Sequence, residues 1–149
     1  MPLLDESTRN EVQKILEGMD QPVRLVMFTQ GHGGVPECHT CSEDRELAEE
    51  VASLNGKIRL EVRDFVADAA LAEKLHVDKI PAIAIMNDGP SPRDYGIRLY
   101  GIPSGYEFST LIEDLLLISK QQHGLTANTL DQISKIHEPV HIQVFTTPT

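Results

Sequence analysis

The chain has 149 residues, of which 40% are hydrophobic and 24% are charged, and its formal net charge is −10. This length is enough to bury one full hydrophobic core. With 13 Lys and Arg against 23 acidic residues, the sequence has no basic stripe for binding nucleic acid. It has no apolar run long enough to span a membrane, and its acidic opening is unlike a signal peptide, so we expect a cytoplasmic protein.

The first half of the chain alternates helical and strand patterns. A Thr-Arg-Asn-Glu capping box predicts a helix over about residues 8–18, and the strand formers that follow predict a strand over residues 23–29. Apolar residues after Cys41 recur at helical spacing. Residues 58–64 alternate apolar and charged, which is typical of a strand exposed on one face.

A short helix, two strands and a longer helix are expected next along the chain. Asp68 is expected to cap a short helix, and the apolar run 82–86 predicts a strand. The turn at residues 87–89 joins this strand to an antiparallel strand that ends near Tyr100. Glycines and a proline then interrupt the chain, and a helix with apolar residues on its inner face follows Gly105.

Acidic residues crowd the helix that follows Cys41. We interpret them as a solvated helix face, with a docking surface for a basic partner as the less favoured alternative. These residues are Glu43, Asp44, Glu46, Glu49 and Glu50.

Cys38 and Cys41 are the two cysteines of the chain, and only His39 and Thr40 separate them. A CxxC sequence between a strand and a helix is typical of a redox dithiol. We expect Cys38 to lie at the helix N-terminus, where unpaired N–H groups and the helix dipole favour a thiolate. Cys38 would then be the catalytic nucleophile that attacks a substrate disulfide, and Cys41 would resolve the mixed disulfide.

The order strand, CxxC helix, strand, helix, Ile80-Pro81, strand, strand, helix resembles the thioredoxin fold. The resemblance implies an α/β architecture with a mixed central sheet flanked by helices. It also implies that the Ile80–Pro81 bond is cis and that its loop lies against the nucleophilic cysteine and holds the substrate chain. We expect His39 and Thr40 to join Ile80 and Pro81 in binding substrate.

Two longer segments, residues 94–108 and 140–149, are similar to the protein disulfide oxidoreductases, also called glutaredoxin-like proteins. Members of that family have two thioredoxin units in tandem, each with its own CxxC. The resemblance implies an enzyme that reduces, forms or exchanges protein disulfides without a bound cofactor. It further implies a flavin-dependent donor similar to thioredoxin reductase, and protein disulfides or a peroxiredoxin as acceptors.

An internal repeat supports the tandem arrangement. Residues 22–29 and 139–146 share Pro, Val, Phe and Thr in register at an offset of 117 residues, and a helix-like segment precedes each copy. We therefore expect a thioredoxin unit with the CxxC over residues 1–122, and the first helix and strand of a second, truncated unit over residues 123–149. The open strand edge of this segment would pair with another chain or dock on the first unit, so we expect a homodimer or a domain swap.

Two alternative functions remain open. The first is a redox adaptor that passes electrons from a flavin-dependent reductase to a peroxiredoxin, as implied by a similarity to the tandem N-terminal domain of the flavin-dependent component of alkyl hydroperoxide reductase. In that domain the working CxxC belongs to the second unit. The second is a structural zinc site that joins the cysteines to His137 and His141, which is less favoured because Pro139 interrupts the helix between these histidines.

The residue that moves protons is not assigned by the sequence. Thioredoxins keep a buried carboxylate on the strand before the CxxC, and residues 23–29 contain no acid. Glu61 and Asp64 on the next strand are candidates, although the alternation of residues 58–64 directs Glu61 outward.

Overall fold

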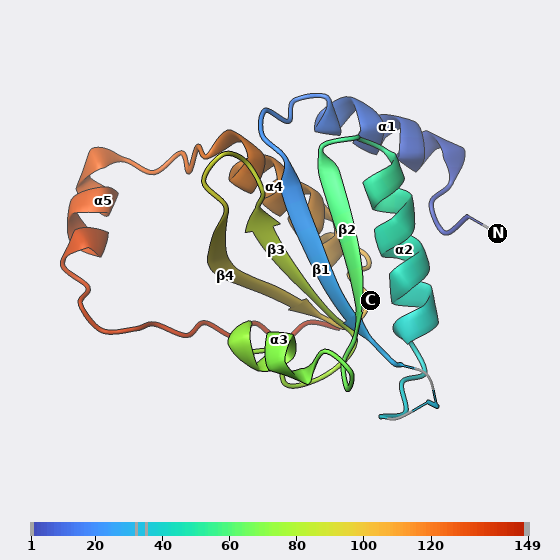
Figure 1. The fold of residues 1–149 in the computed structure, drawn as a ribbon. Coiled ribbons are helices and arrows are strands. Elements are labelled where there is room, and N and C mark those ends of the chain that lie inside the picture. Colours follow the sequence, from blue (N-terminus) through green and yellow to red (C-terminus); the bar gives the residue numbers. More distant parts are fainter. Residues whose placement is uncertain (1, 32, 35, 148–149) are drawn as a thin grey trace.

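The structure is a computed structural model that describes residues 2–31, 33–34 and 36–147 (Figure 1). Helices and strands alternate as far as β3, β4 follows β3 directly, and two helices come after β4. Their order is α1 (Glu6–Leu16), β1 (Val23–Thr29), α2 (Cys41–Ser53), β2 (Ile58–Asp64), α3 (Ala69–Lys74), β3 (Ala82–Asn87), β4 (Arg93–Tyr100), α4 (Tyr106–Lys120) and α5 (Ala127–Ser134).

The four strands form one mixed sheet in the order β2-β1-β3-β4. β1 pairs with β2 in parallel, whereas β3 runs antiparallel to both β1 and β4. Phe28 near the end of β1 lies opposite Ala82 at the start of β3, and Ala82 lies opposite Tyr100 at the end of β4. The loops that follow β1 and β4 and the loop that precedes β3 therefore meet at the same end of the sheet.

Helices cover both faces of the sheet (Figure 1). Alternate residues of β1 point to opposite faces. Leu25 and Met27 belong to the larger core cluster with α1, α2 and α4, and Val26 and Phe28 belong to a second cluster with α3. The chain thus has the thioredoxin fold predicted from its order of elements, with a mixed central sheet between helices.

The predicted N-cap of α1 is wrong. Asp5, rather than Thr8, is the N-cap, and its carboxylate accepts a hydrogen bond from the Thr8 N–H at 2.8 Å. The helix therefore begins at Glu6 and ends at Leu16, two residues earlier at both ends than the prediction. Aspartate is at least as good an N-cap as threonine, and Glu6 in the first turn adds a favourable interaction with the helix dipole.

The segment after α4 contains a helix but, over residues 121–147, no strand. α5 forms where the repeat predicts a helix, none of its residues is buried, and Figure 1 shows it standing away from the sheet. The strand predicted over residues 139–146 does not form, and no strand occurs among residues 136–147. A strand requires a neighbouring strand for its backbone hydrogen bonds, and this segment has none beside it.

Among the described residues, no helix is both long enough and apolar enough to cross a membrane.

Candidate redox site

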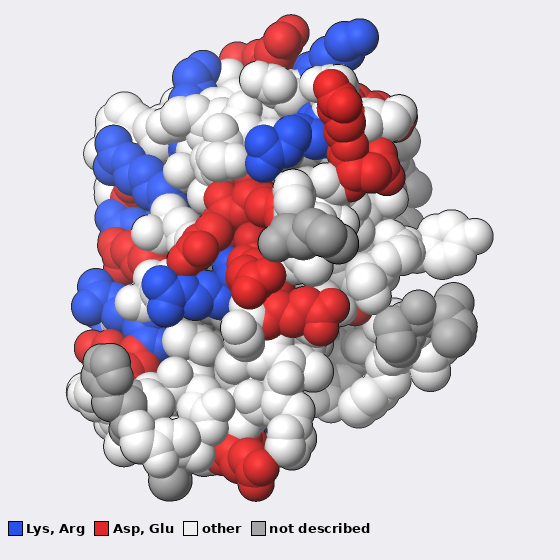
Figure 2. Space-filling view, turned by 90° about the vertical axis from the view of Figure 1, so that its right-hand side faces the viewer, with Lys and Arg blue, Asp and Glu red and all other residues white. Residues whose placement is uncertain are grey.

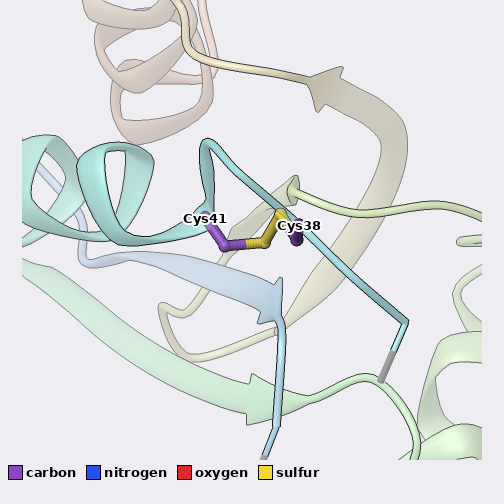
Figure 3. The surroundings of a disulfide bond; sticks show 2 residues. All are labelled: Cys38 and Cys41. Carbon is purple, nitrogen blue, oxygen red and sulfur yellow. A yellow bond between two sulfur atoms is a disulfide. The ribbon is translucent and has the colours of Figure 1, made fainter. Parts of the chain in front are cut away.

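Cys38 and Cys41 form a disulfide at the start of α2 (Figure 3). Their sulfur atoms are 2.00 Å apart and their Cα atoms are 5.5 Å apart. The two cysteines differ in exposure, because Cys38 is half-buried whereas Cys41 is only 3% exposed. Cys38 is therefore the more accessible of the two cysteines.

Cys38, which was expected at the helix N-terminus, lies two residues before the N-cap of α2. α2 begins at Cys41, Thr40 is the N-cap, and Cys38 lies in the turn before it. The first helical bond of α2 runs from the Asp44 N–H to the Thr40 carbonyl at 3.0 Å, so the N–H groups of residues 41–43 lack helical partners. These N–H groups and the helix dipole still favour an anion at the turn that holds Cys38.

Pro81 lies at the same end of the sheet as the cysteines. The Ile80–Pro81 bond is cis, as the resemblance to thioredoxins implies. Pro81 is buried, Ile80 is half-buried, and the Pro81 carbonyl accepts a hydrogen bond from the Gly101 N–H at 3.0 Å. This bond ties the loop before β3 to the end of β4, and the register between Phe28 and Ala82 places both beside the end of β1.

The two residues between the cysteines are both exposed. The Nε2 atom of His39 lies 3.4 Å from the Glu37 carboxylate, and both side chains are largely in solvent. Thr40 makes no side-chain hydrogen bond to the helix although it occupies the N-cap. His39 and Thr40 are therefore available on the surface beside the more accessible cysteine.

Asp44 is a buried acid of the site that the sequence pattern does not reveal. The pattern places it on the solvated face of α2, yet it is 0% exposed, and among the described residues neither of its carboxylate oxygens has a hydrogen-bond partner. Burial, and secondarily the charge of Glu107, raise the pKa of Asp44 to about 7. The helical spacing could have indicated its burial, because Asp44 lies three residues from both Cys41 and Leu47 on the inward face of α2.

Three other acidic residues of α2 do lie in solvent. Glu43, Glu46 and Glu49 are exposed, and Glu49 accepts a hydrogen bond from Arg45 at 2.8 Å. Figure 2 shows acidic side chains gathered on the side of the molecule that carries α2. The solvated-face interpretation is therefore confirmed for these three residues and wrong for Asp44.

The two acids of β2 that the sequence offers for proton transfer have other partners. Glu61 lies 3.4 Å from Arg24 and accepts a hydrogen bond from Arg63 at 3.0 Å. The Asp64 carboxylate accepts hydrogen bonds from the N–H groups of Val66 and Ala67 at 2.9 and 3.0 Å. Asp64 thus orders the turn between β2 and α3.

Within the described part of the chain, no three His, Cys, Asp or Glu side chains converge as a set of metal ligands.

Known proteins match nearly the whole chain at low sequence identity. No family model matches the chain. It is 26% identical over 144 residues to a protein named NADH dehydrogenase from Ferdinandcohnia aciditolerans, and 24% identical over 143 residues to a component of alkyl hydroperoxide reductase from Pseudomonas putida. Both matches cover 96% of this chain, and the chain spans only 24% of each relative.

Two solved structures share the fold over most of the chain. The N-terminal domain of the alkylhydroperoxide reductase AhpF from Enterococcus faecalis matches with a TM-score of 0.75 at 24% identity, over 87% of this chain and 59% of that chain. A protein disulfide oxidoreductase from Aeropyrum pernix matches with a TM-score of 0.72 at 25% identity, over 89% of this chain and 56% of that chain. The chain thus has the thioredoxin fold and a CxxC disulfide, and it resembles both of these proteins.

Proposed function

We propose that the chain is a thiol–disulfide oxidoreductase that reduces, forms or exchanges protein disulfides through Cys38 and Cys41. The observation that carries this proposal is the disulfide at the start of α2 between a half-buried and a buried cysteine. Because the two cysteines differ in exposure, they take different roles in the reaction. Cys38 exchanges with molecules from solvent, and Cys41 reacts only with Cys38.

The chemistry begins from the reduced pair. The Cys38 thiolate, favoured by the N-terminus of α2, attacks one sulfur of a substrate disulfide and forms a mixed disulfide while the first substrate thiol leaves. Cys41 then attacks Cys38, which releases the second substrate thiol and forms the disulfide seen in the structure. Two electrons pass to the substrate, and the reverse sequence oxidises a substrate dithiol.

The surface around Cys38 supports a role in binding the substrate chain. Ile80 and Pro81 lie at the edge of the sheet where β1 leads into the CxxC turn. His39 and Thr40 are exposed between the cysteines. We assign substrate binding to these four residues, in agreement with the similarity to a protein disulfide oxidoreductase.

The relatives suggest the redox partners. One of them is a component of an alkyl hydroperoxide reductase and another is named as an NADH dehydrogenase. A flavin-dependent donor similar to thioredoxin reductase and a peroxiredoxin acceptor would fit both names and a dithiol carrier. The cytoplasm is the compartment we propose, because a CxxC pair is kept reduced and catalytic there.

The end of the chain fits a second unit. We propose that residues 1–122 form one thioredoxin unit and that residues 123–149 begin another, because the sequence repeat covers α5 and the segment after it. The apolar side chains of that segment are exposed and would associate with a second copy of the chain. They include Val140, Ile142, Val144 and Phe145.

A redox adaptor is the second candidate function, because the chain spans only 24% of the relatives that it matches. An adaptor would take electrons from one partner and pass them to another without turning over free disulfides. Reduction of insulin disulfides by the chain, with dithiothreitol as donor, separates the two functions. An enzyme accelerates this reduction, whereas an adaptor leaves it at the uncatalysed rate.

Trapping the mixed disulfide tests the roles of the cysteines. Cys41→Ser removes the resolving thiol, so we expect this variant to accumulate a disulfide-linked complex with insulin chains on a non-reducing gel. Cys38→Ser is the matched control and should form no complex, because its remaining thiol is buried. Equal trapping by the two variants, or trapping by Cys38→Ser alone, would contradict the assignment.

A further inference from the structure

Asp44 is a buried acid that the proposed reaction does not yet use. It is 0% exposed, and both of its carboxylate oxygens lack hydrogen-bond partners within the part of the chain that the structure describes. Burying a carboxylate without a partner is unfavourable, and a purely structural position on this helix face would suit an apolar residue like its neighbours Leu47, Ala48 and Val51. An acid retained at this cost points to a chemical task for the carboxyl group.

The nearest redox group along the helix is Cys41. Asp44 follows Cys41 by three residues in α2, and residues at this spacing lie on one helix face with Cβ atoms about 5–6 Å apart. Both side chains are on the inward face, since Cys41 is 3% exposed. Water therefore has poor access to the Cys41 sulfur, and a thiol in that position needs a nearby base to become a nucleophile.

We propose that Asp44 is the proton acceptor of the Cys41 thiol when Cys41 resolves the mixed disulfide, and the proton donor of Cys41 when the disulfide is reduced. This inference rests on the proposed oxidoreductase function. It assigns to α2 the role for which the sequence offered Glu61 or Asp64 on β2.

The step balances in protons and electrons. With substrate attached to Cys38, the Asp44 carboxylate takes the proton of the Cys41 thiol. The Cys41 thiolate attacks the Cys38 sulfur, the Cys38–Cys41 bond forms, and the bond from Cys38 to the substrate sulfur breaks. The second substrate sulfur leaves as a thiolate, and the proton held by Asp44 passes to it through solvent. Together with the thiol released earlier, this completes the two-electron reduction of the substrate disulfide.

The acidity of Asp44 suits this exchange. Its pKa of about 7 leaves both protonation states populated near neutral pH, which is the condition for efficient proton transfer in both directions. Burial is the main cause of this pKa, and the carboxylate of Glu107 in the first turn of α4 is the second. The Glu107 carboxylate in turn accepts a hydrogen bond from the Thr146 hydroxyl at 3.2 Å.

Other charged groups have less direct access to Asp44. On the sheet face that α2 covers, the charged residue at the end of β2 is Asp64, which is bonded to N–H groups of the next turn. Glu43 and Arg45, the neighbours of Asp44 in sequence, are exposed. The remaining charged residues of β1 and β2 alternate to the opposite face of the sheet and form ion pairs there: Arg24, Arg59, Glu61 and Arg63.

The test follows the two thiol reactions separately in one stopped-flow experiment. The reduced chain is mixed with the aromatic disulfide dithiobis-nitrobenzoate, which releases a coloured thiolate once when Cys38 attacks and again when Cys41 resolves the adduct. For Asp44→Asn we expect an unchanged first phase and a second phase slowed by roughly tenfold or more near neutral pH. The inflection of the second phase with pH, present near pH 7 in the unmodified chain, should disappear.

Two further variants complete the design. Glu43→Gln removes an exposed charge beside Asp44 and should leave both phases unchanged. Glu107→Gln removes the like charge that acts on Asp44 and should move the inflection of the second phase to lower pH, which tests the inference even if Asp44→Asn fails to fold.

The outcomes separate this inference from the function on which it rests. An unmodified chain that shows no second phase would overturn the oxidoreductase function itself. Two phases in the unmodified chain, with the rate and pH profile of the second unchanged in Asp44→Asn, would overturn the role of Asp44 alone. An inflection that does not move in Glu107→Gln would also overturn it.

Discussion

At the scale of single residues, Asp44 makes folding stability depend on pH. Its pKa is about 7 in the folded chain and 3.8 in the absence of the fold. Below about pH 4 both states hold the proton. Between these two values the unfolded chain releases the proton and the folded chain keeps it, so the contribution of Asp44 to stability falls as pH rises and is lowest above pH 7.

We therefore expect Asp44→Asn to gain stability relative to the unmodified chain as pH rises. The difference in free energy of unfolding between the two proteins should change by about 2–4 kcal/mol between about pH 4 and about pH 8. Urea unfolding at several pH values, with the disulfide intact, measures this change. Glu43→Gln serves as the control, and a difference between Asp44→Asn and the unmodified chain that stays constant with pH would show that Asp44 titrates normally.

The sequence predicted the cysteines of the site but not their buried neighbour. Cys38 and Cys41 are identified by a short, rare spacing, so their pairing needs no knowledge of packing. Asp44 stands in a run of acids, and composition favours solvent for such a run. Only its register with Cys41 and Leu47 separates it from Glu43. The pKa of Asp44 is raised mainly by burial and secondarily by Glu107, which is 63 residues further along the chain.

At the scale of elements, local patterns located the strands better than the helix ends. β1 has the predicted bounds, and the turn after β3 joins the two antiparallel strands as expected. Asp68 is the N-cap of α3 as predicted, but its carboxylate accepts from the Asp64 N–H instead of from the helix. Cap positions are set by competition between nearby polar side chains, which the sequence pattern does not resolve.

The segment after α5 shows why a strand pattern alone is insufficient. Residues 139–146 repeat the pattern of β1, yet β1 lies between two strands and this segment lies beside none. The apolar side chains that would be buried within a sheet are consequently exposed, with Ile142 at 81% and Phe145 at 88%. Exposed apolar side chains on an unpaired edge favour association with another chain.

We expect the chain to self-associate through this segment. Ile142→Lys should convert the dimer expected at high protein concentration to a monomer, because it places a charge among the exposed apolar side chains. His141→Lys is the matched control, since it introduces the same charge at the adjacent residue of the extended segment. Sedimentation velocity distinguishes the species, and an unmodified chain that stays monomeric at high concentration would contradict the expectation.

At the scale of the whole molecule, the topology assembles the site from distant segments. Three regions meet at one end of the sheet, because β1 pairs in parallel with β2 and β3 pairs antiparallel with β1 and β4. These regions are the CxxC turn, the Ile80–Pro81 bond and the start of α4, which carries Glu107. The resemblance of the predicted order of elements to the thioredoxin fold anticipated the first two of these regions, whereas the position of Glu107 was not predicted.

The central claim is that Cys38 and Cys41 form a working redox pair, and their reduction potential tests it most directly. The chain is first treated with a chelator, equilibrated in glutathione and dithiothreitol buffers of graded potential, and then alkylated for mass analysis. We predict a single two-electron transition at roughly −200 to −270 mV, the range of glutaredoxins and thioredoxin. Two thiols that are alkylated in every buffer and never form a disulfide would contradict the claim.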